Sequence, residues 1–298
     1  MKKTFSLIGI ICLLTLSFIY TNKVFSLAKE NDPIMKDIVN YKKKHDINPI
    51  EPTITSNVIK IGTSGKVIDV NSSYKNMKEK HRFDENKIIY KEKLPKNTIN
   101  NNYSYYIKNG NNSKKNISII FKVNSNDNLK TINRLLSNYN IVANFFVDET
   151  WLSNNLDNAL LLANNNKVYN LGSNGTYSKS TIKTVNNLIE SITLDDSIFC
   201  LNENQDVDSL DVCKNNKMYT IMPTLLNPSI SDVKKNLDRG IIIAYDLDTF
   251  NISNFKLLIN TITSRNYKIV SLDKIIKEWY WQIIITYIKY KSNKKRGI

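Results

Sequence analysis

The hydrophobic pattern divides the chain into an apolar N-terminal segment, a polar middle region and a longer, regularly alternating C-terminal region. Residues 5–20 are almost uninterruptedly apolar and follow the basic start Met1-Lys2-Lys3. This order is typical of an export signal, and Ser26-Leu27-Ala28 offers small residues for cleavage. The apolar run is short for a bilayer span, yet it lies far from Ala28. For residues 1–28 we therefore keep two interpretations open, a cleaved signal peptide and an uncleaved anchor.

The region 29–115 is polar and lysine-rich, and its apolar runs are short. Residues 58–61 and 66–70 alternate on either side of Gly62-Thr63-Ser64-Gly65, which predicts a small hairpin. Residues 72–80 predict a short polar helix. We interpret this region as a small α+β or extended accessory module or stalk.

From residue 117 onward, short apolar runs alternate with stretches that carry leucine and isoleucine at helical spacing. The runs that predict buried strands are 117–121, 142–147, 167–172, 197–201, 218–222, 240–244 and 267–270. Strict alternation of buried strands with helices predicts a parallel sheet covered by helices. The expected fold class is α/β, an incomplete (β/α)7 barrel over residues 116–277. For the basic, aromatic tail 278–298 two interpretations stay open, a helix on a membrane surface and a helix packed on the barrel.

Composition narrows the possible partners. The formal net charge is +15, but it comes mostly from lysines spread along the chain, without the interleaved aromatics of a nucleic-acid-binding motif. We therefore expect no nucleic-acid partner, and a basic surface of this kind suits an anionic cell wall or membrane. Three cysteines exclude a disulfide-dense scaffold and a four-cysteine zinc site. For Cys200 and Cys213, a disulfide and two free buried thiols are both open.

Several motifs of the barrel region resemble the polysaccharide deacetylase (NodB homology) family. Residues 142–147, VANFFV, resemble its K-A-T-F-F strand, and residues 172–179 resemble its G-N-H-x-x-S-H loop. Residues 239–246 resemble its P-G-x-I-I-L-x-H segment, and residues 267–272 its closing G-Y-x-F-V-T-L. Upstream, residues 50–52 and 65–77 resemble the region before the barrel in YlxY-type proteins, a subgroup of envelope proteins of sporulating bacteria with an N-terminal membrane segment.

The resemblance implies a reaction and a set of partners. Members of the family remove an acetyl group from an N-acetylated sugar. A divalent metal, usually zinc, is held by an aspartate and two histidines and activates a water molecule. A carboxylate serves as general base and a histidine as general acid. The implied partners are cell-wall glycan or peptidoglycan, envelope proteins, and the membrane through the N-terminal segment.

The functional positions of this chain depart from that pattern. The segment that matches the acidic T-F-D-D motif is Phe121-Lys122-Val123-Asn124, which has no carboxylate, and its lysine would repel a cation. The chain's two histidines, His45 and His81, both precede the barrel, so no shift of register supplies an imidazole. The degenerate motif positions are, in chain order, Asn124, Asn174, Lys179, Cys200 and Tyr245, the last matching the general-acid histidine.

The sequence therefore predicts an exported pseudoenzyme that needs no metal cofactor and that binds glycans or partner proteins. The alternative is an active deacetylase with a metal site rebuilt from the acids at 206, 208 and 211 or at 246 and 248. In a third interpretation the barrel is only a scaffold and region 29–115 binds the partner. The ligand-binding candidates are Asn174, Tyr177, Tyr245 and Asp246, and the two tyrosines either stack on a sugar ring or fill the barrel mouth.

Overall fold

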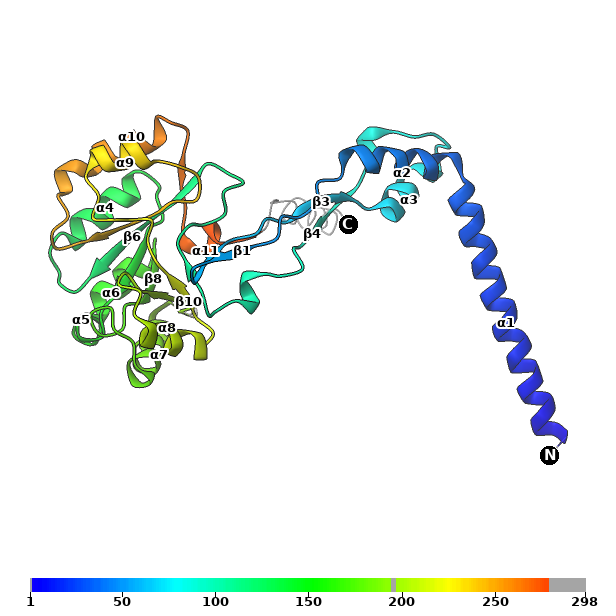
Figure 1. Ribbon diagram of the computed structural model, residues 1–298, viewed down its shortest axis with the longest axis horizontal. Helices are drawn as coiled ribbons and strands as arrows, with labels where there is room; N and C mark the ends of the chain where they lie inside the picture. Colours follow the sequence, from blue (N-terminus) through cyan, green and yellow to red (C-terminus); the bar gives the residue numbers. More distant parts are fainter. Residues whose placement is uncertain (1, 194–196, 279–298) are drawn as a thin grey trace, which may run out of the picture. The chain divides into compact units, whose positions relative to one another are not determined.

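The structure is a computed structural model that describes residues 2–193 and 197–278 (Figure 1). The chain forms two compact units. Unit 1 comprises Met1–Asn48 and Gly65–Lys93, and unit 2 comprises Pro49–Ser64 and Leu94–Ile298.

Unit 1 combines helices with one antiparallel pair of strands. Its core is made by apolar side chains of two helices and these strands, with Ile38 and Met77 fully buried. Asp32 begins the second helix by accepting a hydrogen bond from the Ile34 amide, and Pro33 provides a first helical residue that needs no donor. The elements are α1 (Lys2–Asn31), α2 (Pro33–His45), β3 (Gly65–Ile68), α3 (Val70–Lys78), η1 (Glu85–Lys87) and β4 (Tyr90–Lys93).

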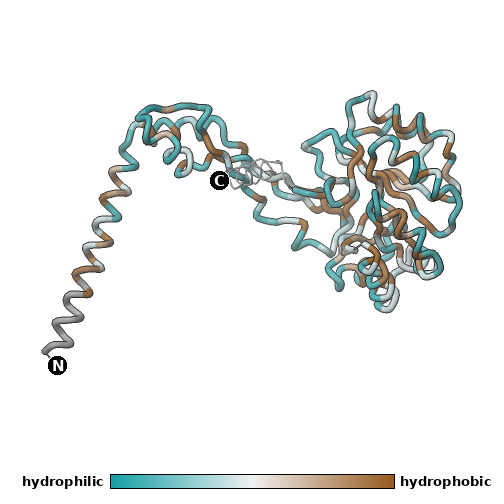
Figure 2. Tube along the Cα trace, turned by 180° about the vertical axis from the view of Figure 1, so that it is seen from behind, coloured by the Kyte–Doolittle hydropathy of each residue, from teal (hydrophilic) through white to brown (hydrophobic). Residues whose placement is uncertain are grey.

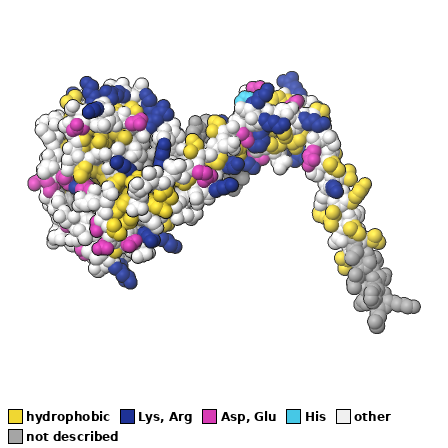
Figure 3. All heavy atoms as spheres, viewed as in Figure 1, with side chains coloured by type: hydrophobic (Ala, Val, Ile, Leu, Met, Phe, Trp, Pro, Cys, Tyr) yellow, Lys and Arg dark blue, Asp and Glu magenta, His cyan; other side chains and the backbone are white. Residues whose placement is uncertain are grey.

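Helix α1 exposes most of its described apolar side chains. Leu13, Phe18 and Phe25 are each more than 60% exposed, and hydrophobic atoms line the described part of this helix in Figure 3. None of the helices described by the structure is both long and apolar enough to cross a membrane.

Unit 2 is built on two sheets of short strands. The first contains only parallel pairs, in the order β11 (Leu225–Leu226), β12 (Ile242–Asp246), β6 (Asn116–Val123), β7 (Asn144–Val147) and β8 (Lys167–Asn170), with β13 (Lys268–Ile269) also pairing β6. The second has the order β1 (Thr53–Thr55), β2 (Val58–Lys60), β5 (Tyr106–Ile107), β10 (Tyr219–Ile221) and β9 (Phe199–Leu201), and only its β1–β2 pair is antiparallel.

Helices surround these strands, and the most hydrophobic segments run through the middle of the unit (Figures 1 and 2). The helices and turns are η2 (Ile99–Asn101), α4 (Leu129–Asn138), α5 (Glu149–Asn154), α6 (Leu156–Ala163), α7 (Lys179–Thr193), α8 (Val207–Asn215), α9 (Ile230–Asn236), η3 (Ile252–Asn254), α10 (Phe255–Thr263) and α11 (Leu272–Ile275). The α/β barrel-like fold class expected from the sequence is confirmed.

Alternation along the strands divides the buried side chains of unit 2 between two cores. Ile120 and Phe146 belong to an inner core that also contains residues of the second sheet, such as Phe199. Phe121 and Tyr245 belong to an outer core shared with the helices. Because successive strand residues point to opposite faces, residues 122 and 246 face the same side as the inner core.

The hairpin expected in the middle region is wrong. Residues 58–61 and 66–70 do not pair with each other: β2 pairs with β1 and β5, whereas β3 pairs with β4. The turn between β1 and β2 is made by Ser56 and Asn57, which both have positive φ, as tight hairpin turns require. The expected boundary at residue 115 also differs from the observed units, because β1, β2 and β5 complete the second sheet of unit 2.

Candidate functional site

A polar pocket with a volume of about 140 Å³ lies beyond the carboxyl ends of β6, β9 and β12. In barrels and open α/β sheets this edge is where ligands bind, because the loops that follow the strands meet there. Four asparagines contribute amides to the wall. The lining residues are Lys122, Asn124, Leu171, Asn174, Gly175, Thr176, Leu201, Asn202, Glu203, Asn204, Asp206 and Asp246.

An ammonium group between two carboxylates occupies one wall of this pocket. The Lys122 Nζ atom lies 2.7 Å from Glu203 Oε2 and 2.6 Å from Asp246 Oδ1. The side chains of Lys122 and Glu203 are 16% and 17% exposed, and that of Asp246 is 34% exposed. The other Asp246 oxygen accepts a hydrogen bond of 2.5 Å from the Asn227 amide.

Strand pairing explains why these charges meet. Lys122 and Asp246 are direct register partners in the parallel pair of β6 and β12, so their side chains lie side by side on the inner face. Glu203 comes from the loop that follows β9 in the second sheet. The ion pair therefore joins the two sheets at the mouth of the barrel.

The electrostatics keep Lys122 protonated. Burial by itself lowers the pKa of its ammonium, but hydrogen bonds and charge from Asp246 and Glu203 outweigh that effect and raise the pKa above its ordinary value. The amine therefore has no free lone pair near neutral pH, and it acts neither as a nucleophile nor as a metal ligand.

The other acids around the pocket have structural partners. Asp248 accepts hydrogen bonds from Ser125 Oγ at 2.9 Å and from the Asn124 amide at 2.5 Å, the amide orientation being assigned from the carboxylate that it faces. Asp206 begins α8 by accepting from the Ser209 amide. The Ser209 hydroxyl, followed by this backbone contact, holds the Asp206 pKa below its usual value.

These residues do not fit the metal that the family resemblance implies. Across residues 2–193 and 197–278, no three or more histidine, cysteine, aspartate and glutamate side chains gather closely enough to hold a metal ion. The carboxylates at the pocket are held by a lysine, an amide or a helix terminus instead. We derive no chemical step through a metal.

Asn174, a ligand-binding candidate from the sequence, lies at the pocket on the loop that follows β8. It has a positive φ of 48°, which asparagine tolerates better than most residues. Its backbone amide donates a hydrogen bond of 2.7 Å to Asp148 Oδ2, and Asp148 also begins α5. The exposed side chain of Asn174 is therefore presented on a fixed backbone. Asp246, a further ligand-binding candidate, and the motif position Asn124 also line the pocket.

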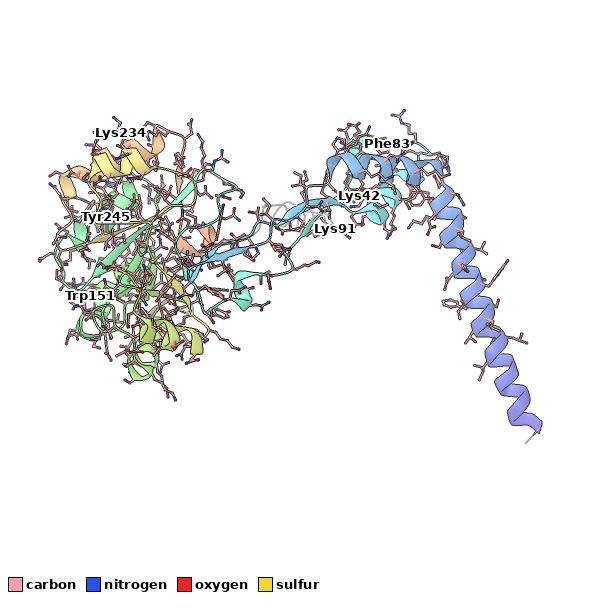
Figure 4. All side chains as sticks on the ribbon, viewed as in Figure 1. Lys42, Phe83, Lys91, Trp151, Lys234 and Tyr245 are labelled. Carbon is pink, nitrogen blue, oxygen red and sulfur yellow. A yellow bond between two sulfur atoms is a disulfide. The ribbon has the colours of Figure 1, made fainter. Side chains whose placement is uncertain are left out.

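Tyr245, another ligand-binding candidate from the sequence, does not lie at the pocket. Its side chain is 5% exposed and packs against Phe121 and Phe250 in the outer core, and it is not one of the residues that line the pocket. Tyr245 is labelled within unit 2 in Figure 4. The reason is strand alternation, because residue 246, not 245, shares the inner face with Lys122. Matched letter by letter, the P-G-x-I-I-L-x-H segment already ends on Asp246.

Tyr177 is also buried, so it offers no face to a sugar. Its hydroxyl donates to the Asn170 carbonyl at 2.8 Å and accepts from the Leu201 amide at 2.7 Å. Burial strongly raises the pKa of this phenol. Tyr177 therefore links β8 to β9 beneath the pocket wall.

The last two motif positions lie outside the pocket wall. Lys179 is exposed at the start of α7. Cys200 is bonded to Cys213, which settles the open question in favour of the disulfide. Cys200 points outward toward α8 because its strand neighbours Phe199 and Leu201 take the inner face. Glu203 was missed by the sequence interpretation, since no motif letter falls on it.

Comparisons with known proteins bear on the fold of the chain. No family model matches the chain. The uncharacterized protein YlxY of Bacillus subtilis is 23% identical over 140 residues, which is 46% of this chain and 44% of YlxY, so the match spans less than half of that relative. The pseudoenzyme BA3943 of Bacillus anthracis, described as a CE4 family member, has 21% identity and a TM-score of 0.64, covering 84% of this chain and 96% of that one.

A second solved structure is the Bc1960 peptidoglycan N-acetylglucosamine deacetylase, with 12% identity and a TM-score of 0.51. It covers 57% of this chain and 92% of its own. The share covered by the pseudoenzyme is too large to be confined to residues 116–277, so that likeness includes part of the preceding region. The chain therefore has the fold of the CE4 polysaccharide deacetylase family, with distant homology to YlxY.

Proposed function

We propose that this protein is an exported, catalytically inactive member of the deacetylase fold that binds N-acetylated glycans of the cell wall. The observation that carries the proposal is the ion pair of Lys122 with Glu203 and Asp246 in a retained pocket. The strand ends still form a cavity, while a protonated lysine replaces the groups that a deacetylase needs.

The pocket wall suits a neutral polyhydroxylated ligand. Amide side chains both donate and accept hydrogen bonds, as sugar hydroxyl and acetamido groups do. Asn124, Asn174 and Asn204 are exposed in the wall, so their amides are accessible to a ligand. A relative of the same fold is a peptidoglycan N-acetylglucosamine deacetylase, which supports this ligand class.

Catalysis requires groups that the described pocket does not bring together. A deacetylase needs a polarising ion, a base and an acid around one carbonyl. Here two of the carboxylates that line the pocket, those of Glu203 and Asp246, are engaged by Lys122. That the solved pseudoenzyme has the same fold supports an inactive role for this chain.

Export is the third part of the proposal. The basic start and the apolar run 5–20 support passage across the membrane, by a cleaved signal or an anchor. The disulfide between Cys200 and Cys213 supports an oxidising compartment outside the cytoplasm.

Binding of the full-length protein to insoluble peptidoglycan and to chito-oligosaccharides tests the proposal. Asn204→Trp fills the pocket mouth from an exposed position whose side chain makes no hydrogen bond to the residues that the structure describes. Asn260→Trp on α10 is the matched control. We expect the wild type and Asn260→Trp to co-sediment with peptidoglycan and Asn204→Trp to lose at least tenfold in affinity.

Two results would contradict the proposal. Release of acetate by the wild type would show that the site is active. Equal glycan binding by Asn204→Trp, or none by the wild type, would remove the pocket as the binding site. The latter result would favour a scaffold role for the barrel, with the partner bound elsewhere on the chain.

A further inference from the structure

A second cavity of unit 2, which we call the basic cavity, has a volume of about 370 Å³ and shares no lining residue with the pocket described above. Three cationic side chains line it: Lys60 at the end of β2, Lys108 directly after β5, and Arg239 shortly before β12. Asp238 is the one acid among the described residues of its wall. Three separate segments of the chain therefore bring positive charge to one cavity.

The register of two strands places Lys60 beside Lys108. β2 and β5 are parallel and Ile59 pairs with Ile107, so the two lysines are the next positions in this register. Register partners present their side chains to the same face, and both of these line the basic cavity. Like charges at opposite positions of two strands repel each other. An anion bound between the two ammonium groups would remove this repulsion.

Backbone contacts hold Arg239 close to this pair. The Gly110 amide donates a hydrogen bond of 2.7 Å to the Gly240 carbonyl, and Thr224 Oγ1 donates one of 2.8 Å to the Lys108 carbonyl. Gly240 has a positive φ of 80°, and a Cβ atom there would lie 2.5 Å from the Gly110 carbonyl oxygen. The loop after β5 and the turn before β12 are thus in direct contact. The backbone positions of the cations are set before a ligand binds, which lowers the cost of binding.

The three cations are available to a ligand. Within residues 2–193 and 197–278, no carboxylate forms an ion pair with any of them. The Asp238 carboxylate accepts a hydrogen bond of 2.7 Å from the Arg239 backbone amide instead. Three cations and one carboxylate give the lining a net charge of +2. The cavity therefore favours an anionic ligand.

The kind of cation and the floor of the cavity indicate which anion fits. A guanidinium forms paired hydrogen bonds with phosphate oxygens, and lysine adds a point charge. A phosphate group alone would fill only part of this volume. The buried side chains of Ile59 and Ile61 also line the cavity, so the carbon chain that carries a phosphate would meet an apolar surface.

We propose that the basic cavity binds phosphodiester groups of an anionic cell-wall polymer through Lys60, Lys108 and Arg239. The three cations lie at exposed positions, where a single phosphate binds weakly. A polymer offers many phosphates at a high local concentration, which raises the overall affinity. The choice of a wall polymer rests on the export proposed above, whereas the anion site itself depends neither on export nor on glycan binding.

Binding of poly(glycerol phosphate) to the full-length protein tests the proposal by isothermal titration at low and at physiological ionic strength. Lys60→Gln/Lys108→Gln should weaken binding about tenfold or more, because two charged contacts are lost. Lys234→Gln/Lys235→Gln is the matched control, since it removes the same charge from exposed positions of α9 outside the cavity. It should stay within about twofold of the wild type, and Lys60→Arg/Lys108→Arg should retain binding.

Three results would overturn the proposal. If a folded Lys60→Gln/Lys108→Gln variant binds the polymer as tightly as the α9 control, overall charge explains the binding. Equal affinity of the wild type for inorganic phosphate and for the polymer, per phosphate group, would assign the cavity to a free phosphate. A single-stranded oligonucleotide with the same number of phosphates is the third competitor. Tighter binding of this oligonucleotide, if the cavity variant abolishes it, would assign the cavity to nucleic acid.

A separate readout keeps this proposal distinct from glycan binding. Lys60→Gln/Lys108→Gln should co-sediment with polymer-free peptidoglycan as the wild type does, because the two cavities share no lining residue. Loss of glycan binding in Asn204→Trp should likewise leave polymer binding unchanged. Failure of one proposal therefore does not imply failure of the other.

Discussion

The buried carboxyl of Glu278 should make the stability of this protein depend on pH in a predictable direction. The residue is 5% exposed, its Oε1 atom accepts a hydrogen bond of 3.1 Å from the Ile99 amide, and its carbonyl accepts one from the Ser64 amide. Burial raises the pKa of Glu278 to about 7, the Ile99 hydrogen bond opposes the rise, and the charge of Glu51 adds to it. The carboxyl of Glu278 is therefore harder to ionise than that of an exposed glutamate. It lies where three segments of the chain meet.

The sign and size follow from linkage. The ordinary glutamate pKa is 4.5, so between pH 4.5 and 7 the unfolded chain releases this proton while the folded chain keeps it. The folded state therefore binds more protons, and the contribution of Glu278 to stability falls as pH rises through this window. The rise in the Glu278 pKa from 4.5 to about 7 corresponds to a change in the free energy of unfolding of about 3 kcal/mol at most. Because solvent partly screens this charge, we expect a change of about 1–3 kcal/mol.

The test is Glu278→Gln, which keeps an oxygen acceptor for the Ile99 amide and removes the charge. Urea unfolding of wild type and variant is measured from pH 4.5 to 8. We expect equal stability near pH 4.5 and a variant that is more stable by about 1–3 kcal/mol at pH 8. All other residues are common to both proteins, so their effects cancel in the difference.

Glu190→Gln, at an exposed position of α7, is the matched control and should give a flat difference across this range. A flat difference for Glu278→Gln as well would refute the reasoning. A variant less stable than the wild type at pH 8 would show that the charged form is favoured in the fold.

Three further perturbations test the packing around the site. Replacing Cys200 and Cys213 by serine should lower the free energy of unfolding by about 3 kcal/mol, because the disulfide joins residues 13 positions apart and so restricts the unfolded chain. In urea unfolding, a reductant should lower the stability of the wild type and leave that of the variant unchanged. Asn144→Ala should lower the free energy of unfolding by about 3 kcal/mol or more, because the fully buried amide makes hydrogen bonds with Ser118, Ile119 and Leu272. The Tm of this variant, compared with that of the wild type, tests the prediction. Tyr245→Phe should be neutral or stabilising by up to about 1 kcal/mol in urea unfolding, because the buried hydroxyl has no partner among the described residues; clear destabilisation would contradict this.

Strand positions in the barrel region could be predicted because burial on both faces produces continuous apolar runs. The runs at 117–121 and 142–147 lie in or overlap β6 and β7. The hairpin at 58–70 could not be predicted correctly, because strand pairing depends on partners that are distant in sequence. β2 pairs with β5, which lies about fifty residues further along the chain. The turn at Ser56-Asn57 contains no glycine, the residue that most often indicates such a turn in a sequence.

The candidate site was only partly predictable. Asn124, Asn174 and Asp246 lie at the pocket, because loops after parallel strands converge at one edge. Tyr177 and Tyr245 do not, since side-chain direction depends on strand parity and on the depth of the loop. Glu203 was not among the residues matched to a family motif, and its role follows only from its distance to Lys122.

The sequence by itself determined which chemistry is available. With both histidines upstream of residue 116 and a lysine in place of the first acidic motif, no folding of the barrel region can assemble a histidine-based metal site. Tertiary structure alone decided what the remaining charges do. Pairing of β6 with β12 and closure by the loop after β9 bring one ammonium and two carboxylates within hydrogen-bonding distance, and such a contact depends on three-dimensional register, which residue types along a chain do not encode locally.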